Sequence, residues 1–305
     1  MVIRKSDYEN YDYREFWKNE KRKYEDSSER IALRKLLLPI KNNGKLFVDI
    51  GCGYGRLFNE YKYFEKIILI DYSLKNLKNA RRHISRYLEF DREKLQNIHF
   101  IVADATNLPL KANVADVVLT VRVVHHINNV EKYFNEISRI IKSGGTIILE
   151  FANKRNTKNI LRTLVGRMDT SAFNLEPSQV GETILNYHPE YIYNFLKERE
   201  FGVEKVISVS NLRLPIIKKI VSHKILVFFE NIFQYLFSFL SLGPSIFLKA
   251  KCRHGNQKSA RGNKISEILI CPNCGSSLSI EKNKIICSGC GKVFQKEEGI
   301  FNLKI

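Results

Sequence analysis

The sequence predicts an α/β fold with a mostly parallel sheet, followed by a small cysteine-rich module. Between residues 46 and 151, five short apolar runs alternate with stretches of helical composition. Such alternation is the pattern of βαβ units with right-handed crossovers. Near the C-terminus, four cysteines are paired as two Cys-x-x-Cys units. The chain of 305 residues is long enough for one full domain and a satellite module.

The first segment, residues 1–43, is predicted to be a charged N-terminal helical segment. Tyr13 to Leu38 is rich in Lys, Arg and Glu, and Pro39 is expected to end the helix. The segment lacks the apolar core of a signal peptide. The longest apolar stretch, Ile225 to Leu242, is interrupted by polar residues and falls short of a membrane span. We therefore expect a cytoplasmic protein without a transmembrane segment.

The main domain is predicted to cover residues 44–250. Its five apolar runs, predicted to be strands, are Leu46–Ile50, Ile67–Ile70, Ile98–Val102, Val114–Val121 and Thr146–Phe151. The helices predicted between them are Leu57–Tyr63, Leu74–Phe90 and Val130–Lys142. After a polar insertion we expect a helix, a strand, one or two apolar helices and a last strand, at Pro189–Glu200, Val203–Val209, 212–242 and Ser245–Lys251.

A glycine-rich turn follows the first predicted strand. The sequence Val-Asp-Ile-Gly-Cys-Gly-Tyr-Gly contains Asp49, Gly51, Gly53 and Gly55. Glycines at alternate positions let the backbone turn sharply and approach a ligand, because no Cβ intervenes. A dinucleotide fingerprint would have its third glycine at position 56, which is arginine here. The spacing favours a ligand without a pyrophosphate, and Asp49 is expected to face the cationic amino-acid end of that ligand.

Two further carboxylates come at the ends of the next two strands. Asp71 directly follows the second strand and is placed to accept two hydrogen bonds from ribose hydroxyls. Asp104 closes the third strand, beside Ala105, and is placed to accept a hydrogen bond from an adenine amine. Because such folds bind ligands at the carboxyl edge of the sheet, we expect the three acids to line one pocket.

The stretch from Leu46 to Phe151 resembles the class I S-adenosylmethionine-dependent methyltransferases, in the broad type 11 group that includes quinone-biosynthesis enzymes. The matching pieces are VDIGCGYGRL, ILIDYS, VADATNLPL, VVLTVRVVHHI and ISRIIKSGGTIILEF. The resemblance implies a Rossmann-like, doubly wound sheet of seven strands and S-adenosylmethionine as cofactor. The cofactor-binding residues that it implies, or that the motifs indicate, are Asp49, Gly51, Gly53, Gly55, Asp71, Tyr72, Asp104, Ala105 and Val121.

The segment after the fourth strand supplies the candidate catalytic residues. Methyl transfer from a sulfonium is an in-line displacement, so the protein must position the acceptor and, where needed, remove a proton. His126 and His125 are candidates for the base, because the imidazole pKa lies near neutrality; alternatively, one of them packs beneath the cofactor. Arg122 is a candidate for holding an acidic acceptor, or it is an ordinary surface charge. The absence of an Asn/Asp-Pro-Pro-Tyr motif after this strand disfavours methylation of exocyclic amines or amides.

The C-terminal module, residues 266–305, is predicted to be a zinc ribbon behind a basic linker at 251–265. Four cysteines with the spacing C-x2-C-x12-C-x2-C form a closed tetrahedral site, so the Zn²⁺ is expected to be structural. Metal binding would supply most of the folding energy of so small a segment. The predicted metal ligands are Cys271, Cys274, Cys287 and Cys290.

The ribbon resembles the Trm112 family of zinc-binding methyltransferase activators, including a closing GIFNL that lacks the proline of that family's ending. The resemblance implies an activator fused in cis, which packs on its own methyltransferase domain or on a partner protein. Members of the family act with methyltransferases that modify tRNA, rRNA or a translation factor.

The charge of the chain bears on its partners. The formal net charge is +18, and an acid-free run from Lys249 to Lys264 carries six basic residues. Such a field favours a polyanion, either nucleic acid or a membrane surface; the alternative is a generally lysine-rich, soluble surface.

Three hypotheses remain open for the acceptor. The first is an enzyme acting on RNA or a translation factor. The second is an enzyme acting on a small, lipid-like, quinone-type acceptor, with a pocket lined by Phe228, Phe229, Phe233, Tyr235, Phe237 and Phe239. The third is a non-catalytic scaffold with the same fold.

Overall fold

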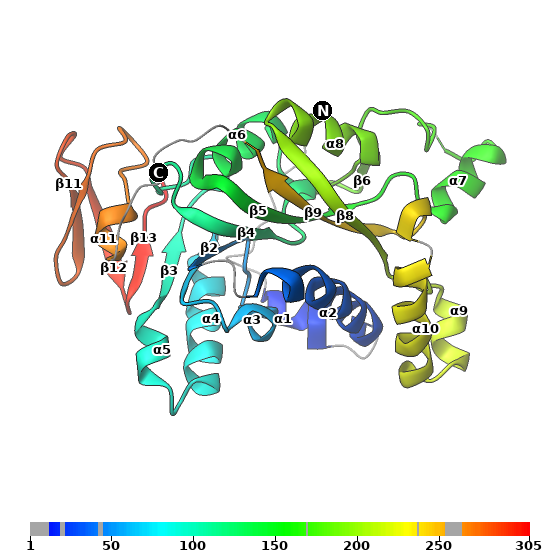
Figure 1. The fold of residues 1–305 in the computed structure, drawn as a ribbon, viewed down its shortest axis with the longest axis horizontal. Helices are drawn as coiled ribbons and strands as arrows, with labels where there is room; N and C mark the ends of the chain where they lie inside the picture. Colours follow the sequence, from blue (N-terminus) through cyan, green and yellow to red (C-terminus); the bar gives the residue numbers. More distant parts are fainter. Residues whose placement is uncertain (1–11, 19–21, 42–44, 169, 237, 254–263) are drawn as a thin grey trace.

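The structure is a computed structural model, and it describes residues 12–18, 22–41, 45–168, 170–236, 238–253 and 264–305. These residues form one mixed sheet of eleven strands, a separate two-stranded sheet and helices on both faces of the large sheet (Figure 1). The strand order is β10-β11-β12-β13-β3-β2-β1-β4-β5-β9-β8. Seven of these strands belong to the main domain and four to the C-terminal module.

The predicted alternation of strands and helices is present. The strands of the main domain are β1 (Leu46–Ile50), β2 (Lys66–Asp71), β3 (Ile98–Val102), β4 (Ala115–Thr120), β5 (Ile141–Ala152), β8 (Phe201–Val209) and β9 (Ser245–Cys252). The first five pair in parallel, whereas β9 runs antiparallel between β5 and β8. The helices that follow these strands are α3 (Phe58–Tyr61), α4 (Leu74–Tyr87), α5 (Arg92–Gln96), α6 (Val130–Ile140), α8 (Pro189–Glu198), α9 (Pro215–Ile220) and α10 (His223–Leu236).

Two apolar cores lie on opposite faces of the sheet. Alternate residues of β1 point to opposite sides, so that Phe47 packs with α2, α3 and α4, while Val48 packs with α6 and α8. Figure 1 shows α1 to α4 and α10 on one face and α6 and α8 on the other. This three-layer arrangement leaves the carboxyl edge of the parallel strands open for a ligand.

The N-terminal segment differs from the single helix predicted for Tyr13 to Leu38. The described residues form two helices, α1 (Tyr13–Lys18) and α2 (Lys23–Leu37), on either side of residues 19–21, which lie outside the described part. Pro39 sits inside a short 3₁₀ turn (Leu38–Ile40) that continues α2, because a proline is compatible with the first turn of a helix. The helical composition is therefore confirmed, and α2 ends at Leu37, just before the 3₁₀ turn that contains Pro39.

The polar insertion between β5 and α8 has secondary structure of its own. It contains α7 (Thr157–Leu164) and a hairpin formed by β6 (Ser178–Val180) and β7 (Ile184–Asn186). Buried polar groups hold it: the Lys154 ammonium donates to the carbonyl oxygens of Asn174 (3.0 Å) and Glu176 (2.5 Å).

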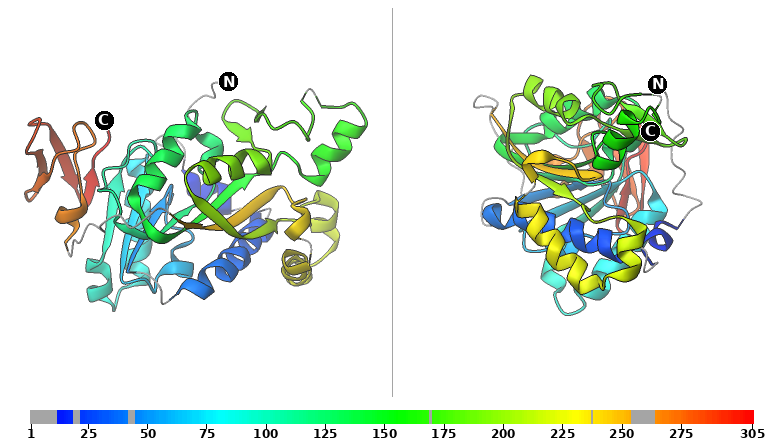
Figure 2. Two further views of the ribbon diagram at one scale, coloured as in Figure 1. Left: turned by 45° about the horizontal axis from the view of Figure 1, so that its top comes forward. Right: turned by 90° about the vertical axis from the view of Figure 1, so that its right-hand side faces the viewer.

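The resemblance implies a sheet of seven strands; the main domain contributes seven, and the C-terminal module extends the sheet to eleven. The module contains α11 (Ile265–Ile268), β10 (Leu278–Ile280), β11 (Lys284–Cys287), β12 (Val293–Glu297) and β13 (Ile300–Asn302). Strand β13 pairs in parallel with β3, with Phe301 opposite Ile101. The edge of the main domain's sheet is thus covered by the same chain, and Figure 2 shows the module at one end of the long axis.

Two further predictions concern the basic linker and the absence of a transmembrane segment. Most of the basic linker, residues 254–263, lies outside the described part. Among the described residues, no helix combines the length and the apolar character that crossing a bilayer requires.

Candidate functional site

A pocket opens at the carboxyl ends of the central strands. Its walls come from the ends of β1, β2, β3 and β4, from the turns that follow them and from α1. The lining residues are Tyr13, Ile50, Gly51, Gly53, Ile70, Asp71, Tyr72, Asn76, Ala103, Asp104, Ala105, Val121, Arg122, Val123, His126 and Ile127. Nine of the residues predicted for the cofactor or catalytic site are among them: Gly51, Gly53, Asp71, Tyr72, Asp104, Ala105, Val121, Arg122 and His126.

The glycine turn forms one side of this pocket. Gly51, Gly53 and Gly55 all have positive φ, at 75°, 57° and 75°. The Gly51 amide donates to the Ile70 carbonyl oxygen at 2.7 Å, which ties the turn to the end of β2. A Cβ on Gly51 would lie 2.1 Å from a methyl group of Val123, so a side chain there cannot be accommodated without movement.

We predict that Gly51→Ala destabilises the fold more than Gly144→Ala does. Both glycines have nearly the same positive φ, 75° and 71°, and only Gly51 also faces a close contact. Each substitution incurs the strain of a left-handed alanine, on the order of 1–2 kcal/mol. The clash adds to this at Gly51, by roughly 1–3 kcal/mol. Urea unfolding of the two variants measures the difference, and equal losses would contradict the proposed role of the contact.

Asp71 holds the glycine turn as well as facing the pocket. One carboxylate oxygen accepts the Gly53 amide at 2.8 Å. The other accepts the Ser73 amide at 2.9 Å and the Asn76 side-chain amide at 3.3 Å. Asp71 therefore ties the glycine turn to the start of α4 while lining the pocket, and its expected role toward a ribose stays a prediction.

Asp104 and Ala105 form the opposite wall. The Asp104 carboxylate accepts the amide and the hydroxyl of Thr106, both at 2.8 Å, so the turn after β3 is fixed by its first residue. The same turn touches the C-terminal module, because the Asn107 side-chain amide donates to the Pro272 carbonyl oxygen at 3.0 Å.

Asp49 and Gly55, which were also predicted for the cofactor site, are not among the residues that line the pocket. Asp49 is buried on the face of β1 that packs against α3, where the Tyr61 hydroxyl donates to it. Burial raises the pKa of Asp49 to about 7, and the Asp71 charge adds to this rise, whereas the bond from Tyr61 opposes it. Gly55 packs against Ile84 of α4. Alternation along the strand explains the result, because the side chain of Asp49 leaves β1 on the opposite side from those of its two neighbours.

The two histidines after β4 also separate. His126 lines the pocket, and its Nδ1 lies 2.8 Å from the Thr183 carbonyl oxygen. A carbonyl only accepts, so Nδ1 carries the proton and Nε2 is the basic nitrogen of the neutral ring. His125 is buried behind it and does not line the pocket; its Nδ1 has no hydrogen-bond partner among the described residues. Burial lowers the pKa of both rings.

Arg122 lies in the pocket wall with its charge already paired. Its guanidinium donates to the buried Glu29 carboxylate of α2, through Nε at 2.9 Å and a terminal nitrogen at 2.5 Å. The second Glu29 oxygen is paired with Arg56 at 2.5 Å. Burial alone would raise the pKa of Glu29, but the two guanidinium groups hold it below its ordinary value. Arg122 therefore fixes α2 against the pocket.

The aromatic residues of α1 were not predicted as site residues. Tyr13 lines the pocket and its ring lies 3.1 Å from where a Gly53 Cβ would be. Trp17, one turn further on, lies under the guanidinium groups of Arg56 (3.7 Å) and Arg122 (5.0 Å). These cation–π contacts hold α1 over the glycine turn. Nothing in the sequence near Tyr13 indicates this role, because the contacts are formed by residues far away along the chain.

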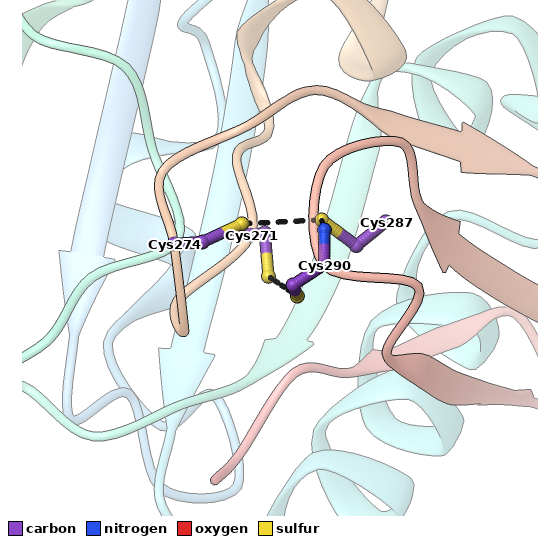
Figure 3. A group of neighbouring side chains, drawn as sticks. All are labelled: Cys271, Cys274, Cys287 and Cys290. Atoms are coloured by element: carbon purple, nitrogen blue, oxygen red, sulfur yellow. Dashed lines mark hydrogen bonds between the residues drawn. The ribbon is translucent and has the colours of Figure 1, made fainter.

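The four cysteines of the C-terminal module come together in one cluster (Figure 3). Their sulfur atoms all lie within 4.8 Å of one another. The Sγ–Sγ distances are 3.8 Å for Cys271 and Cys290 and 3.3 Å for Cys274 and Cys287. Tetrahedral coordination with Zn–S bonds of about 2.3 Å needs sulfurs about 3.8 Å apart, so the cluster fits a zinc ion. The other two cysteines, Cys52 and Cys252, are not part of it.

Comparison with known families relates part of the chain to one class of protein. Residues 48–149 match the family model described as a methyltransferase domain. This range contains the glycine turn, both pocket carboxylates and the two histidines. This part of the chain is therefore similar to a methyltransferase domain, and the strand order defines an α/β fold.

Individual relatives are similar to parts of the chain. An uncharacterized protein of Methanocaldococcus jannaschii is 39% identical over 121 residues, which is 39% of this chain and 47% of that protein. A ubiquinone/menaquinone biosynthesis C-methyltransferase of Campylobacter jejuni is 26% identical over 187 residues, 57% of this chain and 74% of that enzyme. The chain thus spans about half of the first relative and about three quarters of the second.

Solved structures share the fold at low identity. Magnesium protoporphyrin IX methyltransferase from Synechocystis, solved with bound S-adenosylhomocysteine, has a TM-score of 0.53 at 16% identity, covering 81% of this chain and 96% of that one. A chain in a complex that contains the Trm112 methyltransferase activator of Haloferax volcanii has a TM-score of 0.52 at 17% identity, covering 80% and 97%.

Proposed function

We propose that this chain is an active S-adenosylmethionine-dependent methyltransferase. The observation that carries the proposal is one pocket that is lined by Asp71 and Asp104, from neighbouring strand ends, and by the bare glycine turn. These groups suit a nucleoside ligand: Asp71 accepts ribose hydroxyls, Asp104 and Ala105 meet the adenine, and Gly51 and Gly53 leave room for the amino-acid part. S-adenosylmethionine, when bound, supplies a methyl group on an activated sulfonium. The alternative of a non-catalytic scaffold would not need the pocket open.

Calorimetry and methyl transfer test this proposal together. The full chain should bind S-adenosylmethionine and S-adenosylhomocysteine at one site, and should transfer a radiolabelled methyl group to one fraction of a cell extract. Donor binding without labelling of protein, RNA, lipid or small-molecule fractions would leave only the scaffold. Absence of donor binding would refute the proposal.

We further propose His126 as the general base that takes a proton from the acceptor. Its side chain lies in the pocket wall, the Thr183 carbonyl fixes its tautomer, and its lowered pKa keeps it neutral at pH 7. Arg122 and His125 are proposed as positioning residues, because the guanidinium is paired with Glu29 and the second imidazole is buried behind the pocket.

His126→Gln is predicted to slow methyl transfer about 100-fold, the usual contribution of a general base. Donor affinity should be nearly unchanged. The neighbouring variant His125→Gln is the matched control and should slow transfer much less. Because the folded pKa of His126 is depressed, the wild-type rate should stay constant as pH falls through 6.5 and drop only at lower pH. Steady-state rates on the labelled fraction across this pH range give both readouts, and equal losses in the two variants would rule out the assignment.

The C-terminal module is proposed to be a structural zinc ribbon that acts as a Trm112-like activator in cis. The four-cysteine cluster fits zinc, and β13 pairs with the edge strand β3. The similarity to a chain crystallised with the Trm112 activator supports this role. Because β3 is already paired, we expect the chain to need no separate activator.

The acceptor class is a further proposal. The basic surface and the ribbon are compatible with tRNA, rRNA or a translation factor as acceptor. The aromatic run considered for a lipid-like acceptor does not line the donor pocket: its described members lie on or just after α10, and Phe228, Phe229, Tyr235 and Phe239 are exposed there. That exposure leads to a different role for these residues.

A further inference from the structure

Helix α10 buries polar side chains and exposes large apolar ones, the reverse of the usual arrangement. The stripe that it buries against α2 contains Leu226, Glu230 and Gln234, at intervals of four residues. One Glu230 oxygen accepts the Tyr24 hydroxyl at 2.6 Å, and the other accepts the Ser210 amide at 2.7 Å. The helix is therefore anchored through polar contacts.

The opposite side of α10 exposes large apolar residues. Phe228 is 62% exposed and Tyr235 is 83% exposed. The neighbouring helix α9 continues this surface, with Ile216 at 71% and Ile220 at 78%, one helical turn apart. A helix of a water-soluble protein normally exposes its polar side. We name the set formed by Ile216, Ile220, Phe228, Phe229, Tyr235 and Phe239 the apolar arm.

A second exposed apolar segment lies toward the same end of the molecule. In α7 and directly after it, Leu161, Leu164 and Val165 are 58%, 70% and 65% exposed. Figure 1 and the left view of Figure 2, in which the long axis is horizontal, place α7, α9 and α10 at the end opposite the zinc ribbon. Monomeric proteins rarely leave so much apolar surface together without a partner.

The exposed charged residues of α7, α9 and α10 are all basic, because Glu230 of α10 is buried. On α7 these are Lys158 and Arg162. Lys219 and Lys224 are exposed beside the apolar arm. Apolar side chains surrounded by lysine and arginine match the surface of a membrane with anionic lipids: the lipid tails take the apolar groups and the headgroups take the cations.

We propose that the apolar arm docks the protein onto the surface of an anionic lipid membrane. The helices would lie in the plane of the interface, since none of the described helices is suited to span a bilayer. RNA explains the cations but not the exposed isoleucines, whereas lipid explains both. Docking would give the enzyme access to an acceptor dissolved in the membrane. This consequence rests on the proposed methyltransferase function.

Vesicle co-sedimentation of the full chain tests the proposal. The probes are vesicles of phosphatidylcholine alone and of phosphatidylcholine with phosphatidylglycerol. We expect binding to the anionic vesicles, and a loss of about tenfold in the variant Ile220→Ser/Phe228→Ser. The variant Lys219→Glu/Lys224→Glu should lose roughly tenfold as well, and only at low salt. Phe90→Ser is the matched control, because Phe90 is 97% exposed between α4 and α5, outside the arm, and it should bind like the wild type.

Three outcomes would overturn the proposal. They are unchanged vesicle binding by the serine double variant, binding of tRNA without binding of vesicles, and light scattering that shows a wild-type dimer which the same variant dissociates. All variants touch exposed side chains, and circular dichroism verifies their folding. Donor binding is measured by calorimetry on the same samples. A wild type that binds the donor but not the vesicles refutes only the docking. A wild type that does not bind the donor refutes the methyltransferase function.

Discussion

Replacing Asp71 with alanine should lower the affinity for S-adenosylmethionine by roughly 10³-fold. A hydrogen bond from a ribose hydroxyl to an ionised carboxylate is worth about 1.5–3 kcal/mol. The alanine would also release the Gly53 amide, which Asp71 holds at 2.8 Å, and so loosen the turn that the donor contacts. Isothermal calorimetry with the wild type and the variant measures the effect.

The matched pair for this experiment is Asp71→Asn and Asp91→Asn. An asparagine in place of Asp71 would keep the shape and one acceptor oxygen, so its loss should be smaller than that of alanine. Asp91 is an exposed N-cap of α5, and asparagine caps a helix about as well as aspartate. Donor binding should therefore be unaffected by Asp91→Asn. If Asp71→Ala binds the donor like the wild type, the pocket is not the donor site.

The two pocket carboxylates could be located from the sequence because each stands at or just after the end of a recognisable strand. The chain direction and the carboxyl edge of a parallel sheet then determine where their side chains gather. Asp49 lies within β1, and its side chain contacts Tyr61 and does not line the pocket, so its expected role toward the ligand stays a prediction. Strand β1 is buried on both sides, so the apolar pattern alone does not reveal from which face the Asp49 side chain points.

Long-range contacts set the limit of prediction elsewhere. Tyr13 reaches the pocket because α1 is held by Arg56 and Arg122, and this arrangement requires Glu29 between the two cations. No local pattern relates these four positions. The apolar run at residues 225–242 was recognised, but a buried Glu230 reverses the side of α10 that faces the protein. The pairing of the ribbon with β3 could not be derived either. The cysteine spacing indicates a metal site, but it does not indicate which strand of the main domain the ribbon contacts.

The contacts of the ribbon make zinc removal informative about the donor pocket. Pro272 lies between two zinc-ligand candidates, and its carbonyl holds Asn107 in the turn that begins with Asp104. Two further bonds join the same regions: the Lys111 amide donates to Ile268 at 2.8 Å, and the Ile270 amide donates to Pro109 at 3.1 Å. The ribbon therefore supports the wall of the pocket that is proposed to receive adenine.

Cys287→Ser is predicted to abolish zinc binding, unfold the ribbon and weaken donor binding. Zinc contributes about 10–16 kcal/mol to modules of this size, far more than their small core provides. Loss of the ribbon exposes the edge of β3 and frees the turn after it, so donor affinity should fall by about tenfold, the value of one or two lost supporting bonds. Metal analysis, hydrogen exchange at β13 and β3, and calorimetry report the three effects.

Cys252→Ala is the matched control for this change. Cys252 is equally buried, in β9, but outside the metal cluster. Its replacement should cost about 1 kcal/mol of stability, keep one zinc per chain and leave the exchange of β13 slow. A Cys287→Ser chain that lacks zinc and still protects β13 would show that the ribbon is held by its pairing with β3 alone. A zinc-free chain with an unfolded ribbon and unchanged donor affinity would show that the turn after β3 needs no support from Pro272, and the ribbon would then be a stability element and not an activator.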